Sequence, residues 1–156
     1  MTAAIHSLRA AVPGGACLTL ALALLAPARP GEAATVSIRA EVILASNQGT
    51  GTDERLGPVA KQLGDSFKYS RYELVAAPGG EAQVAQTWRT PLPGGRTLEV
   101  TPTAVADGNY TLQVRVLGPK GEALITSSVR LRTGGTVLIG GPPHPPGVLI
   151  IALSAS

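Results

Sequence analysis

Turn signals recur about every ten residues along most of this chain, and the segments between them alternate apolar and polar side chains. The turns fall at 78–80, 91–95, 107–108 and 118–121, and each is rich in glycine, proline or aspartate. In segment 109–117 the side chains at 110, 112, 114 and 116 are apolar, and those between them are polar. This periodicity predicts a mainly β fold, either an antiparallel β-sandwich or a meander.

The last quarter of the chain supplies the predicted hydrophobic centre. Segment 129–132 alternates, as a half-buried strand does, whereas 137–139 and 148–153 are continuously apolar. Continuous, β-branched runs are typical of strands covered on both faces. The proline-rich segment 142–147 is predicted to be an exposed loop between these two core strands.

One segment departs from the β pattern and predicts an amphipathic helix packed on the sheet. Thr52 or Asp53 is suited to cap its N-terminus, and Pro58 is suited to its first regular turn. We expect Gly64 to fray the last turn. A single apolar stripe at helical spacing is formed by Leu56, Val59, Ala60, Leu63 and Phe67.

The other predicted strands lie on either side of this helix. Segment 35–44 alternates, with Val36, Ile38, Ala40, Val42 and Leu44 on one face. Further strands are predicted at 69–77, at 81–90 with Val84, Gln86 and Trp88 on one face, at 96–106 with Leu98 and Val100 inward, and at 122–133. A β-bulge is predicted at Ser127 and Ser128, where the inward face of the last of these strands switches.

Residues 1–34 have the pattern of a secretory signal peptide. A positive charge at Arg9 precedes the apolar run 16–26, and Ala26-Pro27-Ala28 offers a cleavage site. We therefore expect a single β-rich domain at 35–156 in the periplasm or outside the cell, with no stable membrane span after cleavage. The sole cysteine, Cys17, would be lost with the signal, so the mature chain would contain neither a disulfide nor a thiol nucleophile.

Composition and motifs exclude several function classes. The net charge is +3, only 15% of residues are charged and no basic cluster is present, which argues against a nucleic-acid partner. No metal-ligand spacing, cofactor motif or catalytic motif is visible, so we expect no metal, no cofactor and no enzyme activity. The paired glycines at 134–135 and 140–141 are followed by strand patterns and not by a helix, so they indicate turns.

His144, the sole histidine after the signal, is the one candidate for catalysis. A hydrolase would need it to meet Asp107 or Glu99 and a hydroxyl such as that of Ser127 or Ser128. No nucleophile-elbow pattern supports this, and the hydrolase stays an unfavoured alternative. The prolines around His144 make a second alternative, a pre-ordered docking segment.

A binding surface is the more favoured site hypothesis. Arg115, Arg130 and Arg132 are predicted to share the polar face of neighbouring strands, which could hold an acidic partner, a glycan or a lipid headgroup. The sole tryptophan, Trp88, is either a stacking platform for a sugar or a core residue.

Residues 129–141, Val-Arg-Leu-Arg-Thr-Gly-Gly-Thr-Val-Leu-Ile-Gly-Gly, resemble a signature near the end of bacterial secretins, the outer-membrane pore subunits of secretion and pilus systems. Segment 148–153 is similar to the apolar strand that closes their β-domain. The proline-rich segment 142–147 departs from that pattern, and no functional residue transfers. The resemblance implies a pore-less relative or an accessory of an envelope complex.

These observations give one leading expectation and one main alternative. We expect an exported, non-enzymatic structural or protein-interaction module whose partners are envelope or secretion-system proteins. The alternative is a module that binds an envelope glycan or lipid.

Overall fold

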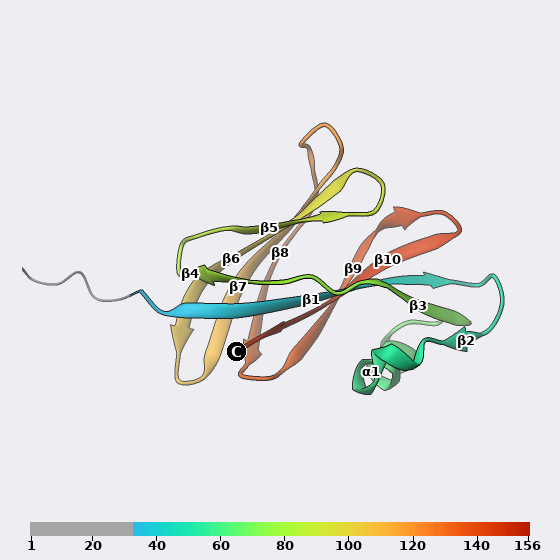
Figure 1. Ribbon diagram of the computed structural model, residues 1–156, viewed down its shortest axis with the longest axis horizontal. Coiled ribbons are helices and arrows are strands. Elements are labelled where there is room, and N and C mark those ends of the chain that lie inside the picture. Colours follow the sequence, from blue (N-terminus) through green and yellow to red (C-terminus); the bar gives the residue numbers. More distant parts are fainter. Residues whose placement is uncertain (1–32) are drawn as a thin grey trace, which may run out of the picture. The chain divides into compact units, whose positions relative to one another are not determined.

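Two antiparallel-rich β-sheets and one α-helix make up the protein in a computed structural model, which describes residues 33–156 (Figure 1). The predicted signal peptide lies outside the described residues as far as residue 32. Within residues 33–156, none of the helices has the length and hydrophobicity needed to span a lipid bilayer.

The first sheet has six strands and is built around the first and last strands of the described chain. Strand β1 (Thr35–Ser46) pairs antiparallel with β10 (Gly147–Ala155), which pairs antiparallel with β9 (Thr136–His144). On its other side, β1 pairs with β3 (Arg71–Ala76) along one half and with β4 (Gly79–Gln83) along the other. The short β2 (Gly51–Thr52) extends the sheet beyond β3.

The second sheet is a four-stranded antiparallel meander. Its strands in spatial and chain order are β5 (Trp88–Leu92), β6 (Arg96–Ala106), β7 (Asn109–Leu117) and β8 (Ala123–Arg132). The Asp107-Gly108 turn joins β6 to β7 with positive φ at both residues, 52° and 70°, as a type I′ hairpin requires. The hairpin predicted at this dipeptide is therefore confirmed.

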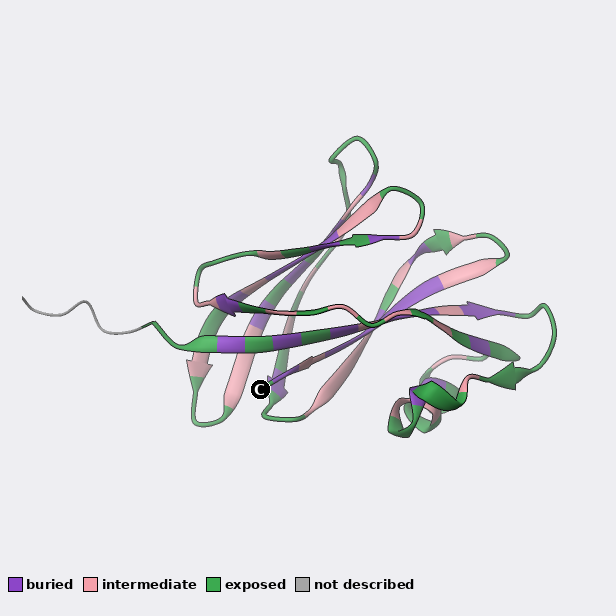
Figure 2. Ribbon diagram, viewed as in Figure 1, coloured by how far each residue is buried: buried purple, intermediate pink, exposed green. Residues whose placement is uncertain are grey.

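The larger apolar core fills the space between the two sheets. The alternating face of β1 points into it, as do the inward side chains of β6 and β7. Fully buried members include Val36, Leu98, Val114, Ile151 and Leu153. Buried and exposed residues alternate along the first half of β1 (Figure 2). The prediction of a mainly β fold with one packed helix is confirmed, and the arrangement of the two sheets is that of a sandwich.

A second apolar cluster covers part of the opposite face of the six-stranded sheet. A 3₁₀ turn, η1 (Glu54–Leu56), leads into helix α1 (Pro58–Ser66), which begins at the predicted proline. Leu56 and Leu63 are buried against Ile43 and Ile150 of the sheet. Because β10 has one core on each face, its run of apolar residues is continuous, as predicted. Gly64 does not end the helix, which closes two residues later.

The strand predicted at 81–90 is wrong, because the chain leaves one sheet and enters the other within it. Strand β4 ends at Gln83, residues 84–85 form a turn, and β5 begins at Trp88. Ala85 has a positive φ of 69°, which breaks the extended pattern. The alternation of Val84, Gln86 and Trp88 therefore does not belong to one strand face.

Two further predictions are wrong in position. The bulge lies near Leu124, where the β7–β8 register shifts, and Ser127 and Ser128 pair regularly with Val114 and Gln113. The proline-rich segment is mostly strand, since β9 runs through residue 144 and only 145–146 form the turn. Proline is tolerated there because β9 is an edge strand and needs few of its amide donors.

Candidate functional site

The outer face of the four-stranded sheet is polar, and neither the helix nor the other sheet covers it. We call it the open face. Its side chains point away from the core because they alternate with the buried residues of β6 and β7. Across the strands they are paired as Glu99 with Arg115, Thr101 with Gln113, Gln113 with Ser128, Arg115 with Thr126, and Thr111 with Arg130.

One carboxylate on the open face is almost fully enclosed by two arginines. Glu99 has a relative exposure of 6%, and its Oε1 accepts a hydrogen bond from Arg89 Nε at 2.7 Å. Its Oε2 accepts a second from Arg115 Nη1 at 3.3 Å. Because both guanidinium groups bind this carboxylate, its negative charge partly neutralises the positive charge of Arg115. The alternation of segment 96–106 does not predict the burial of Glu99.

Arg130 and Arg132 differ from the other arginines within residues 33–156. Those at 39, 55, 71, 89 and 115 form ion pairs, and Arg96 donates to a backbone carbonyl. Arg130 and Arg132 are exposed at alternate positions of β8, and neither forms an ion pair or side-chain hydrogen bond with another described residue. The open face therefore carries two unpaired arginines, separated by the row Thr101, Gln113 and Ser128 from the Glu99 cluster, which consists of Glu99, Arg89 and Arg115.

A hollow of about 350 Å³ adjoins Arg130 at one end of the open face. The hollow exists because Ala104 and Ala106 have small side chains. Polar groups of Asp107, Asn109 and Thr111 border it. The Asn109 amide donates to the carbonyl of Asp107 at 3.2 Å. The hollow thus offers an acid, an amide and a hydroxyl beside a free guanidinium group.

Trp88 does not lie on the open face. Its side chain packs on the inter-sheet core and pairs across the sheet with the buried Val100. A methyl group on Gly80 of β4 would lie 2.6 Å from Trp88 Cδ1, which places the indole directly over that glycine. Trp88 is half-buried between β4 and β5, separated from Arg115, Arg130 and Arg132 by the sheet.

His144 lies at the end of β9, in the hairpin that joins β9 to β10. This hairpin approaches Arg96 in the hairpin that joins β5 to β6 of the other sheet. Its Nδ1 is 3.5 Å from Arg96 Nη1, and Arg96 Nη2 donates to the carbonyl of Pro143 at 2.8 Å. The carboxylates and hydroxyls considered for a triad are elsewhere: Asp107 lies in the β6–β7 turn and Glu99 is bound by two arginines. Ser127 and Ser128 lie on β8. The structure therefore does not assemble the hydrolase constellation around His144.

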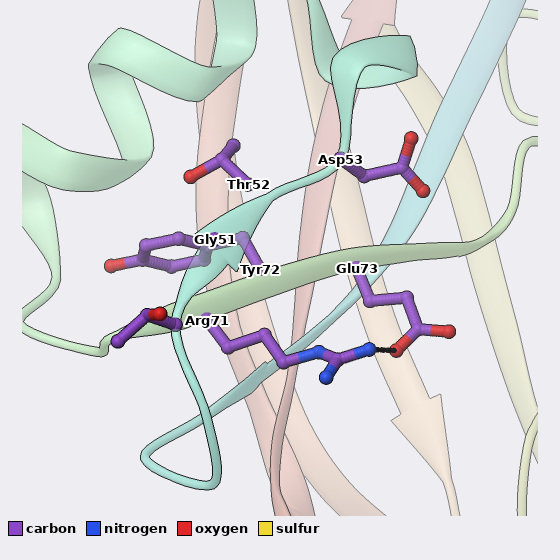
Figure 3. Close-up of a pocket in the computed structure, with 7 residues that line it drawn as sticks. Gly51, Thr52, Asp53, Arg71, Tyr72 and Glu73 are labelled. Atoms are coloured by element: carbon purple, nitrogen blue, oxygen red, sulfur yellow. Dashed lines mark hydrogen bonds and ion pairs between the residues drawn. The ribbon is translucent and has the colours of Figure 1, made fainter.

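A second hollow of about 340 Å³ lies beside β2 and β3, bordered by residues 50–53 and 71–73 (Figure 3). Arg71 is ion-paired with Glu73 at 3.3 Å, and the carboxylate of Asp53 points away from that pair. Hydrogen bonds from the Arg55 side chain, the Arg55 amide and the Leu74 amide hold the pKa of Asp53 well below its usual range. Asp53 thus caps η1 and binds the backbone of β3, and Arg71 is paired with Glu73, so the charged groups that border this hollow are already bound within the protein.

Within residues 33–156, no three histidine, cysteine, aspartate or glutamate side chains are grouped so that they could hold a metal ion. The open face thus unites three of the five predicted surface residues, Arg115, Arg130 and Arg132, and leaves Trp88 and His144 apart. Comparisons with protein-family models, with curated proteins and with solved structures found no match for this chain.

Proposed function

We propose that this protein is a non-catalytic interaction module of the bacterial envelope that binds an acidic partner protein through the open face of its four-stranded sheet. The observation that carries the proposal is the pair of unpartnered arginines, Arg130 and Arg132, on an uncovered sheet face. Exposed charges of one sign steer an oppositely charged partner and fix its orientation.

The surrounding architecture supports this assignment. Helix α1 covers part of one outer face of the sandwich and the inter-sheet core occupies the interior, whereas neither of these apolar clusters includes a side chain of the open face. The Glu99 cluster holds Arg89 and Arg115 in place, so the face is ordered before a partner arrives. Preformed side-chain positions reduce the entropy that binding must overcome.

Export and an envelope location rest on the signal-like pattern of residues 1–34. The resemblance of residues 129–141 to secretins stays a prediction. It makes an envelope secretion complex the first place to look for the acidic partner.

Poly-L-glutamate is a suitable probe, because it presents carboxylates on a polypeptide without any other chemistry. The purified chain is titrated with it by calorimetry at low salt, as wild type and as the Arg130→Glu/Arg132→Glu variant. We expect the variant to bind roughly tenfold more weakly or not at all, and wild-type binding to weaken as salt rises.

The matched control is Arg39→Glu/Lys61→Glu, which changes the net charge equally at two exposed positions of the six-stranded sheet and the helix. An interaction that depends only on net charge would weaken equally in both variants. That outcome, or no binding by the wild-type chain, contradicts the proposal.

The hollow beside Arg130 favours one alternative, a site for an acidic sugar of an envelope glycan. Its carboxylate, amide, hydroxyl and guanidinium groups match the hydrogen-bonding groups of a sugar acid. Titration with glucuronate oligosaccharides separates the two. An Asn109→Ala change would weaken sugar binding and leave poly-L-glutamate binding unchanged.

A further inference from the structure

Strand β8 forms one edge of the four-stranded sheet and is paired on one side only. It hydrogen-bonds to β7 along its length, and no other strand of residues 33–156 pairs with its second side. An unpaired edge presents a row of backbone donors and acceptors to any extended chain that approaches.

Three other edges carry features that obstruct pairing. Strand β5 contains Pro91, and β9, the opposite edge of the six-stranded sheet, contains Pro142 and Pro143. The outer side of β3 is occupied by Asp53, whose carboxylate accepts from the Leu74 amide. Strand β8 has ten residues, no proline, and no charged residue before Arg130.

The side chains of β8 are also incompletely covered. Ile125, Ser127 and Val129 point toward the core yet are only half-buried, whereas the inward residues of the neighbouring β7 at 112, 114 and 116 are fully buried. Leu124 has a relative exposure of 41%. One additional strand beside β8 would cover the apolar members of this set.

We propose that the edge of β8 receives an extended segment of the acidic partner as a fifth strand of the sheet. This inference rests on the proposed function and specifies its binding mode. Residues directly opposite each other on paired strands project from the same side of the sheet. Alternate residues of the added strand therefore lie beside Arg130 and Arg132. The segment that fits has acidic residues on the open face and apolar residues beside Ile125 and Val129.

The test compares two synthetic peptides of identical composition. In one, glutamate and valine alternate along about ten residues, which matches the period of a strand. In the other, the same residues are arranged as a glutamate block and a valine block. We expect the alternating peptide to bind at least about tenfold more tightly than the block peptide, and only in the chain that keeps Arg130 and Arg132.

Amide hydrogen exchange on the full chain supplies the structural readout. The β8 amides that do not face β7 should exchange at least about tenfold more slowly when the alternating peptide is present, and those of β5 should not change. Equal binding of both peptides, with no protection in β8, overturns strand addition but leaves the proposed function intact. Binding of neither peptide, nor of poly-L-glutamate, overturns both.

A second copy of this chain is the other occupant that the edge could take. Concentration-dependent protection of β8 without peptide, together with a dimer in analytical ultracentrifugation, would show that occupant and contradict the inference.

Discussion

Replacing Gly80 by alanine should destabilise the protein because the new methyl group would collide with Trp88. The methyl carbon would lie 2.6 Å from Cδ1 and 2.9 Å from Cε2 of the indole, whereas ordinary carbon contacts begin near about 3.5 Å. The ring would have to move by roughly 1 Å against the inter-sheet core. Overpacking of this kind costs about 1–3 kcal/mol.

Gly79 provides the matched control, one position earlier in β4. A methyl group there would meet only the carbonyl oxygen of Ile38 at 3.5 Å, an ordinary contact. Gly79→Ala should therefore be neutral or stabilise the fold by up to about 1 kcal/mol through reduced entropy of the unfolded chain.

The assay is urea unfolding followed by tryptophan fluorescence, since Trp88 is the one tryptophan of the chain. In a Trp88→Leu background, which has no tryptophan fluorescence, unfolding is followed by circular dichroism. Gly80→Ala should lower the free energy of unfolding much less in that background. Equal stability of the Gly80→Ala and Gly79→Ala variants would refute the placement of Trp88 between the sheets. It would also restore Trp88 as a candidate sugar platform.

Four other changes follow from the same structure. Ile150→Ala should cost about 2–5 kcal/mol in urea unfolding, because this side chain is fully buried under the helix, and a cost below about 1 kcal/mol would contradict that packing. Asp53→Asn should lower Tm at pH 7. The pKa of Asp53 is depressed in the folded protein, so its carboxylate stabilises the fold above about pH 4 and this stabilisation is lost as the pH falls further. The difference in Tm between the wild type and this variant should therefore shrink toward pH 2. A difference that does not depend on pH would contradict this. Gly108→Ala should destabilise the protein by about 1 kcal/mol, because φ is 70° at that turn position. Gly64→Ala should stabilise it by up to about 1 kcal/mol, because Gly64 lies in the helix with open space around it. The reverse order of stability in thermal melts would contradict the placement of Gly108 in the turn and of Gly64 in the helix.

Much of the fold could be predicted because local pattern and tertiary environment agree. Strand β7 was predicted with its observed bounds, since each apolar residue on its inward face meets the inter-sheet core. Pro58 begins the helix because a proline lacks the amide that the first turn leaves unbonded.

The failures come from positions where tertiary context overrides the local pattern. Nothing in segment 81–90 distinguishes one strand from two strands that belong to different sheets. Proline argues for a loop in general, yet at 142–143 it is compatible with an edge strand. The location of an edge depends on the order of strands in the sheet, which a single strand does not encode.

The candidate site was predicted only in part for a similar reason. The three arginines were placed on one face from alternation alone, and the structure confirms that placement. The contact between Glu99 and Arg115 depends on a register shift between Pro102 and Ala104. Without that shift, a regular hairpin would place Glu99 opposite an inward residue, so its enclosure could not be read from the turn.

The central claim is that the open face of the four-stranded sheet is where the acidic partner binds. The most direct measurement is NMR mapping of backbone amides during titration of the purified chain with poly-L-glutamate. The account predicts the largest shifts at Thr111, Gln113, Ser128, Arg130 and Arg132, with little change in helix α1. Shifts concentrated on α1 and β3, with none on β7 and β8, would contradict it.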